Sequence, residues 1–149
     1  MPVVVLLDTN VWVSAFINPS GTPAKLRQAW YESKFDVAIS LSLLEELADV
    51  LTRPRITNKY PVNAADVEEL FQLLIQRGIS VFPTGSVKEC RDPDDDLILE
   101  TAILSKAKYA VTRDDDITRD QDLIAHLQTH GITVLTVQKF WEKVEKNDL

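Results

Sequence analysis

The sequence has little of what secreted and membrane proteins are built from. Cys90 is the only cysteine among 149 residues. A disulfide within the chain is therefore excluded, which fits a reducing compartment. The apolar run at residues 3–7 is too short for a signal peptide, lacks a basic start and stops at Asp8. No later stretch is long and apolar enough to span a bilayer. We expect a cytoplasmic protein with no membrane partner.

Histidine is almost as scarce. The only two, His126 and His130, stand four residues apart in an expected helix, which is the spacing of a helical metal pair. No glutamate follows His126, so the metalloprotease motif is absent. His130 falls where a helix ends, a position that favours histidine in any case. A zinc site at this pair is therefore disfavoured.

Basic residues are outnumbered, with 16 Lys and Arg against 23 Asp and Glu. The formal net charge is −7 and the pI is about 4.8. An acidic total argues against non-specific coating of DNA or of a membrane surface. An RNA substrate is not excluded, because bound cations can neutralise an acidic cleft while basic residues line its rim.

Short apolar segments alternate with helical patterns along the whole chain. Strands are expected at residues 2–7, 35–39, 79–82, 109–112 and 132–136, and helices at 23–33, 41–51, 64–76, 95–106, 121–130 and 137–144, with a further one opening near Asn10. Asn10 and Thr22 are the expected N-caps of the first two helices. Alternation of this kind predicts an α/β fold with a mostly parallel five-stranded sheet flanked by helices on both faces. Neither a linker nor an internal repeat interrupts it, so one domain over residues 1–149 is expected.

Acidic residues stand at the ends of two of these strands. Asp8 follows the first and Asp114 the fourth, and the carboxyl ends of parallel strands collect at one edge of a sheet. Glu46 falls near the buried stripe of its helix, whereas Glu45 is nearer solvent. Asp95 falls on the inward side of a helix start. We expect the four acids Asp8, Glu46, Asp95 and Asp114 to converge.

Carboxylates gathered in one place repel each other, and such a site usually holds a divalent cation. Two such ions about 4 Å apart can stabilise both oxygens of an in-line displacement at phosphorus. The pattern therefore favours phosphodiester hydrolysis. A structural interpretation stays open for each acid: Asp8 as a helix N-terminal charge, Asp92 or Asp94 as a cap, and Asp114 in a surface turn.

Five segments in order resemble the motifs of PIN domains. They are residues 5–11, residues 40–47, residues 91–95 with 99–102, residues 107–114, and residues 135–140. The resemblance covers nearly the whole chain. It is closest to the branch regarded as toxin components of toxin–antitoxin systems, similar to the VapC-type ribonucleases, and it implies a PIN-like three-layer fold.

The resemblance also implies roles for particular residues. Asp8, Glu46, Asp95 and Asp114 match the acidic quartet that holds Mg²⁺ or Mn²⁺, and Asp116 matches a further acid. Asp92 matches an aspartate typical of this branch. Thr9 and Thr112 match hydroxyl positions that orient carboxylates, and Asn10 matches a polar residue at the edge of the site. An RNA substrate, a small antitoxin and a homodimer are the implied partners.

Arginines near these motifs are candidates for contact with the RNA backbone. Arg113 is the strongest because it adjoins Asp114, and Arg91, Arg53 and Arg55 follow. The last two belong to an insertion at residues 53–63 that is longer than in compact family members, which bears on the shape of the substrate groove.

Two other functions remain open at this point. Phosphatases of the haloacid dehalogenase type also place an aspartate after a first strand, but they need a second one two residues later, where this chain has Asn10. The other alternative is a catalytically silent PIN scaffold that binds RNA or a partner protein. All four acids of the quartet are present, which favours the enzyme.

Overall fold

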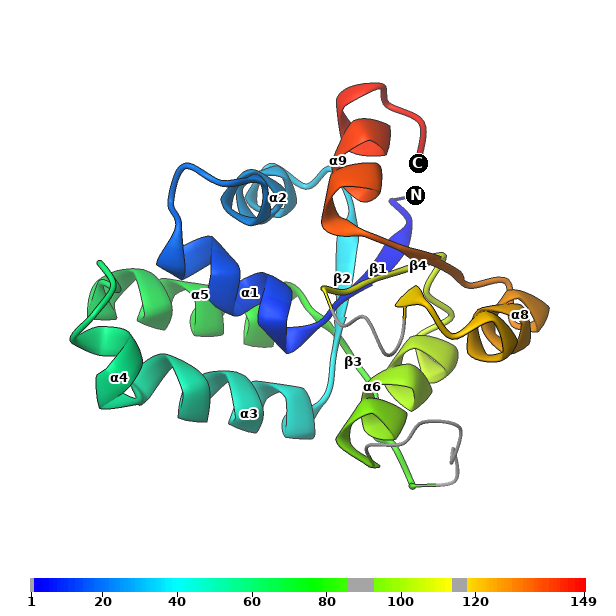
Figure 1. The fold of residues 1–149 in the computed structure, drawn as a ribbon, viewed down its shortest axis with the longest axis horizontal. Helices are drawn as coiled ribbons and strands as arrows, with labels where there is room; N and C mark the ends of the chain where they lie inside the picture. Colours follow the sequence, from blue (N-terminus) through cyan, green and yellow to red (C-terminus); the bar gives the residue numbers. More distant parts are fainter. Residues whose placement is uncertain (1, 86–92, 114–117) are drawn as a thin grey trace.

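The structure is a computed structural model that describes residues 2–85, 93–113 and 118–149, with residues 93–95 described by their backbone alone (Figure 1). Strands and helices alternate along the chain as the sequence predicts. In chain order they are β1 (Val4–Leu7), α1 (Thr9–Ile17), α2 (Thr22–Tyr31), β2 (Asp36–Ile39), α3 (Leu41–Thr52), α4 (Pro54–Thr57), α5 (Ala64–Arg77), β3 (Ile79–Ser80), α6 (Pro93–Leu104), β4 (Tyr109–Val111), α8 (Gln121–Thr129), β5 (Thr133–Leu135) and α9 (Val137–Glu145).

The five strands form one sheet in the order β3-β2-β1-β4-β5, and every pair is parallel. The chain moves outward from β1 through β2 to β3, and then crosses back to place β4 on the other side of β1. The winding direction therefore changes between β1 and β4. In open parallel sheets a ligand crevice forms at such a switch point, outside the carboxyl ends of the strands.

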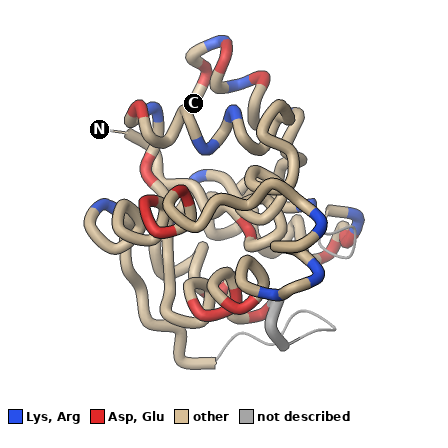
Figure 2. The backbone as a smooth tube through the Cα atoms, turned by 90° about the vertical axis from the view of Figure 1, so that its left-hand side faces the viewer, with Lys and Arg blue, Asp and Glu red and all other residues tan. Residues whose placement is uncertain are grey.

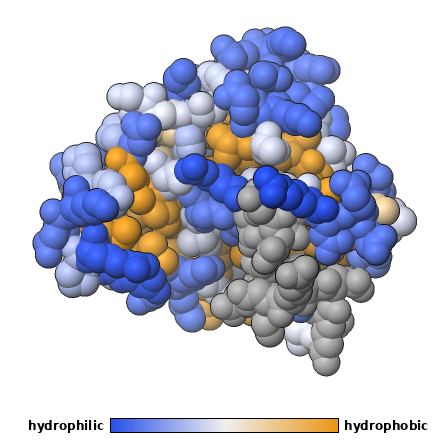
Figure 3. Space-filling model, in the orientation of Figure 1, coloured by the Kyte–Doolittle hydropathy of each residue, from blue (hydrophilic) through white to orange (hydrophobic). Residues whose placement is uncertain are grey.

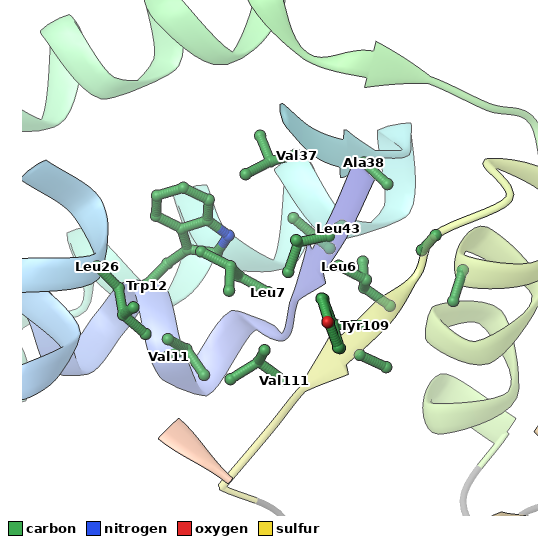
Figure 4. Packing of buried hydrophobic residues seen from close by; sticks show 14 of the residues in the cluster. Leu6, Leu7, Val11, Trp12, Leu26, Val37, Ala38, Leu43, Tyr109 and Val111 are labelled. Atoms are coloured by element: carbon green, nitrogen blue, oxygen red, sulfur yellow. The ribbon is translucent and has the colours of Figure 1, made fainter. Parts of the chain in front are cut away.

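Helices cover both faces of the sheet and produce three layers. The helices α1, α2, α3 and α5 lie on one side, and α6 and α8 lie on the other (Figure 1). β1 runs through the middle, and Leu6 and Leu7 are 1 % exposed. Figure 4 shows Trp12 of α1 and Leu43 of α3 among the side chains packed around it. A strand buried on both faces explains why the sequence reads as a continuous apolar run rather than as an alternating one.

Aromatic pairs join helices to each other and to the sheet. The rings of Trp12 and Trp30 meet edge to face with centroids 5.4 Å apart, which ties α1 to α2. Phe140 of α9 packs in the same way on Phe35 at 5.2 Å and contacts Tyr109 at 5.7 Å. Such pairs contribute about 0.5–1.5 kcal/mol each beyond the burial of their area.

Several helix ends differ from the sequence-based expectation. The first helix is capped by Asp8 and not by Asn10, because the Asp8 carboxylate accepts the backbone N–H of Thr9. Gly21, without a side-chain cap, precedes the helix that was expected to be capped by Thr22. The stretch after Pro54, expected to be irregular, forms the one-turn helix α4.

Apolar side chains reach the surface in separate patches. In the view of Figure 3 one lies beside α5 and another below α9, with hydrophilic residues between them. The large exposed side chains among the described residues are Leu41, Ile75, Ile79, Phe82 and Leu104. None of the helices in the described ranges combines the length and the apolar character needed to cross a bilayer.

Gly78 marks a close approach between α5 and β2. Its φ of −66° is open to any residue, so conformational freedom is not the reason for glycine. A Cβ at this position would lie 2.5 Å from the carbonyl oxygen of Leu74 and 2.8 Å from Cδ1 of Ile39. The absence of a side chain lets the end of α5 turn directly into β3.

We predict that Gly78→Ala lowers the free energy of unfolding by about 1–3 kcal/mol, because the added methyl group forces backbone and core to shift. Urea denaturation measures the loss. Gly131→Asn is the matched control, since Gly131 has a φ of 75° in open space, which asparagine tolerates. Equal losses in the two variants would contradict the packing explanation.

Candidate active site

The site begins at the switch point of the sheet. Leu7, the last residue of β1, pairs with Val111, the last residue of β4. The backbone N–H of Asp8 then donates to the carbonyl of Val111 at 3.0 Å. This register brings Asp8 beside Thr112, although 104 residues separate them in sequence. Both side chains are buried, and each is 4 % exposed.

Among the residues that the structure describes, Thr9, Thr112 and Asn10 donate to the Asp8 carboxylate. One oxygen accepts the N–H of Thr9 at 2.7 Å. The other accepts the Thr112 hydroxyl at 2.8 Å and, more weakly, the Asn10 side-chain amide at 3.4 Å. The charge also sits at the N-terminus of α1, where the helix dipole stabilises an anion. Asp8 is thus both the N-cap of α1 and a carboxylate held in one orientation at the end of β1.

Glu46 joins the site through Thr9, whose hydroxyl donates to its Oε2 at 3.0 Å. Thr9 therefore bridges the two carboxylates, through its backbone to Asp8 and through its side chain to Glu46. Glu46 is nonetheless exposed to solvent. The buried residues of α3 are Leu43, Leu47 and Leu51, and Glu46 lies at the rim of this stripe, from which its carboxylate reaches Thr9.

A groove of about 260 Å³ extends from Glu46 along α3 toward α6. Its lining combines carboxylates, hydroxyls, one guanidinium and apolar side chains, contributed by Ser40, Ser42, Leu43, Glu46, Asp49, Arg53, Leu97 and Ile98. On the α6 side its lining is Leu97 and Ile98, which follow Asp95 by two and three residues in the same helix. The groove offers room for part of a substrate next to the acids.

Several predicted residues lie outside the described part of the structure. These are Arg91, Asp92, Asp114 and Asp116, together with the side chain of Asp95, whose backbone lies in α6. Within residues 2–85, 96–113 and 118–149, no three histidine, cysteine or acidic side chains are close enough to hold a metal ion together. Asp8 and Glu46 are the described members of the quartet. The rings of His126 and His130 pack against each other at 5.2 Å on α8.

The candidate arginines have different surroundings. Arg113 is exposed and donates from Nη1 to the Ser14 hydroxyl at 2.7 Å. Arg53 is paired with Asp49 at 2.5 Å along α3, and Arg55 is exposed on α4. Viewed along the backbone, acidic and basic positions are interspersed (Figure 2).

Glu100 is a residue that sequence reasoning missed. It stands within the apolar pattern of α6 and is only 3 % exposed. Its carboxylate accepts the N–H of Gly85 at 3.0 Å and the N–H of Thr84. It thereby anchors the turn that precedes the segment carrying Asp92. The available signal was a charged residue enclosed between Leu99 and Ala102, where a buried carboxylate needs donors.

The arrangement suits a hard cation better than nucleophilic catalysis. The groups brought together are carboxylates and hydroxyls, which are the oxygen ligands of Mg²⁺ and Mn²⁺. The threonines fix the direction of the carboxylates, as partners of ligands do in metal sites. Cys90 lies outside the described residues, and the described contact of the two histidines is with each other on α8.

Comparison with known proteins gives the family of the chain. A sequence model of the PIN domain family matches residues 4–116, so the chain belongs to the PIN domain family. It is 31 % identical over 144 residues to an uncharacterized protein of Methanocaldococcus jannaschii, a match that covers 95 % of this chain and 92 % of the relative. Because the chain belongs to the PIN domain family, the alternative of a haloacid-dehalogenase-like phosphatase is set aside.

A solved structure shares the fold. It is VapBC2 from Rickettsia felis bound to a DNA fragment from their promoter, with a TM-score of 0.51 and 16 % identity. The superposition covers 89 % of this chain and 98 % of the matched one. The predicted α/β architecture of PIN type, like that of a VapC protein, is confirmed.

We predict that Glu100→Gln lowers the free energy of unfolding by about 1–3 kcal/mol, because its amide group can no longer satisfy both backbone donors as an ion does. Urea denaturation of the purified protein measures the change. Glu45→Gln is the control, because Glu45 is exposed on α3 and should shift stability by less than about 0.5 kcal/mol. A loss confined to the control, or absent from Glu100→Gln, would refute the anchoring role.

Proposed function

We propose that this protein is a metal-dependent ribonuclease that hydrolyses phosphodiester bonds in RNA, as the toxin component of a toxin–antitoxin pair. The observation that carries the proposal is the buried Asp8 carboxylate at the switch point, oriented by Thr112 and linked through Thr9 to Glu46. Membership of the PIN domain family and the shared fold with VapBC2 support the same conclusion.

The proposed ligands of Mg²⁺ or Mn²⁺ are Asp8, Glu46, Asp95 and Asp114, with Asp116 as a further acid and Asp92 in a supporting role. When bound, the ion supplies an activated water and neutralises charge on the phosphate. Asp8 fits direct coordination because hydrogen bonds fix its oxygens. Glu46 fits a second ion or its water, because it is exposed and held at one oxygen.

The other residues hold the substrate and the acids in place. Thr9 and Thr112 keep the two carboxylates from turning away, and Asn10 links Asp8 to the start of the segment after β4. A chain with a net charge of −7 repels RNA unless cations are bound. Arg113 is the proposed contact to the RNA backbone, with Arg91, Arg53 and Arg55 as weaker candidates.

The fold shared with VapBC2 also supports a proposal for the protein partners of this chain. The similar solved structure is a VapBC2 assembly on promoter DNA. We propose that this chain likewise pairs with a small antitoxin protein and forms a homodimer. Co-expression with the product of a short neighbouring reading frame, followed by size-exclusion chromatography, tests the pairing.

We predict that the purified protein cleaves RNA in Mg²⁺ or Mn²⁺ and that Asp8→Asn lowers the rate by at least about 100-fold, because a ligand charge is lost. EDTA should abolish cleavage by the wild type. Asp36→Asn is the matched control, because Asp36 begins β2 at the opposite end of the sheet, and it should cleave normally.

Two outcomes would count against the proposal. Equal cleavage by wild type and Asp8→Asn would identify a contaminating nuclease. No cleavage of single-stranded, structured or transfer RNA by the wild type in either metal would favour the silent scaffold.

A further inference from the structure

Arg113 is fastened to α1 at two points. Its backbone N–H donates to the Asn10 side chain at 3.2 Å, and its Nη1 donates to the Ser14 hydroxyl at 2.7 Å. The Asn10 amide in turn contacts the Asp8 carboxylate. An exposed arginine that follows a strand is thus held along the helix that begins at the proposed metal ligand. Its orientation is set by the fold and does not depend on a substrate.

The acceptor on Ser14 is itself oriented. The Ser14 hydroxyl donates its hydrogen to the Asn10 carbonyl at 2.7 Å, four residues earlier on α1. With the hydrogen committed there, the oxygen lone pairs are left to accept from Arg113. Ser14 is half-buried, which restricts its side chain further. The pair Ser14–Arg113 is therefore a directed contact between a half-buried hydroxyl and an exposed cation.

The side-chain partner of the Arg113 guanidinium is the uncharged Ser14 hydroxyl. This distinguishes Arg113 from Arg53, the arginine that lines the groove. Arg53 is paired with the carboxylate of Asp49 at 2.5 Å, so its charge is already compensated. Within the described part of the chain, no carboxylate forms an ion pair with Arg113. The charge of Arg113 is thus not compensated by a described carboxylate. Besides the N–H that Ser14 accepts, its guanidinium has four further N–H donors in a planar fork suited to phosphate. Ordering it in advance reduces the entropy lost on binding.

The position of the guanidinium indicates which phosphate it meets. The Cα of Ser14 lies six residues beyond Asp8, and its hydroxyl reaches back to the Asn10 carbonyl, so the guanidinium that it holds lies roughly one turn of α1, about 5 Å along the axis, beyond Asp8. A hydrogen bond spans only about 3 Å. A phosphate placed at Asp8 for cleavage is therefore not the natural partner of this guanidinium, whereas a neighbouring phosphate of the same strand is.

We propose that Ser14 is a positioning residue that presents Arg113 to a phosphate adjacent to the one cleaved. This inference rests on the proposed ribonuclease function. It assigns Arg113 to uniform binding of the RNA strand, which is felt equally in the ground state and the transition state. Loss of the contact should raise KM and leave kcat nearly unchanged.

The test measures binding without cleavage. A fluorescent single-stranded oligoribonucleotide is titrated with Asp8→Asn protein in Mg²⁺ at several salt concentrations. Arg113→Gln should weaken binding about 10-fold and lower the salt slope by about 0.7, the share of one phosphate on a single strand. Lys146→Gln removes the same charge from an exposed position after α9 and should leave the slope unchanged.

The positioning role of Ser14 is tested by asking whether the effect of its substitution on RNA binding depends on Arg113. Ser14→Ala should weaken binding about 3-fold when Arg113 is present and have no effect in Arg113→Gln, because residues that act together are not additive. Ser14→Thr keeps the hydroxyl and should bind like the parent. Ser105→Ala is the control, since the Ser105 hydroxyl, just after α6, also donates to a backbone carbonyl, that of Ala102, but contacts no arginine in the described structure.

Two results would overturn the inference: an unchanged KM for Arg113→Gln in the otherwise wild-type enzyme, whether or not kcat falls, or equal loss of binding from Ser14→Ala with and without Arg113. Because binding is measured in a variant that does not need to cleave, a failure of catalysis is distinguished from a failure of this contact. Unfolding in urea verifies that each variant is folded.

Discussion

The structure depends on one buried carboxylate at the edge of the central strand. Asp8 is 4 % exposed, and removing a charge from water is unfavourable unless donors replace the solvent. The N–H of Thr9 and the hydroxyl of Thr112 supply those donors. The Thr112 contact arises from the register of β1 against β4, whereas the Thr9 contact is the local N-cap of α1, so the pairing that builds the core also brings the second donor to the acid. A shift of this register by one residue would move Asp8 out of line with Thr112 and separate the pair.

Thr9 then divides the acids into two environments. It contacts a buried carboxylate through its backbone and an exposed one through its hydroxyl. Asp8 is held rigidly, whereas Glu46 remains open to solvent and to the groove beside α3. Two carboxylates with different freedom suit different tasks at a cation, one as a fixed ligand and the other as a partner of water. The arginines divide in a similar way, since Arg53 is neutralised by Asp49 and Arg113 is held by the neutral Ser14.

The sequence was sufficient for the architecture because the relevant signals are local. The apolar run before Asp8, the alternation of strands with helices and the hydrophobic face of α3 each depend on neighbours in the chain. What it missed depends on contacts between distant segments. Glu100 is buried because Thr84 and Gly85 return to it, and Glu46 is held by Thr9, which lies 37 residues earlier in the chain. The choice of Asp8 over Asn10 as the cap depends on where β1 ends. Convergence of Asp95 and Asp114 with Asp8 remains a prediction.

The central claim is that Asp8 holds a divalent cation at the switch point. Anomalous diffraction from crystals of the wild type soaked in Mn²⁺ tests it most directly. We expect a peak about 2.0–2.2 Å from a carboxylate oxygen of Asp8, shared with further acids of the quartet. A manganese ion bound elsewhere while the region around Asp8 is ordered and empty would contradict it.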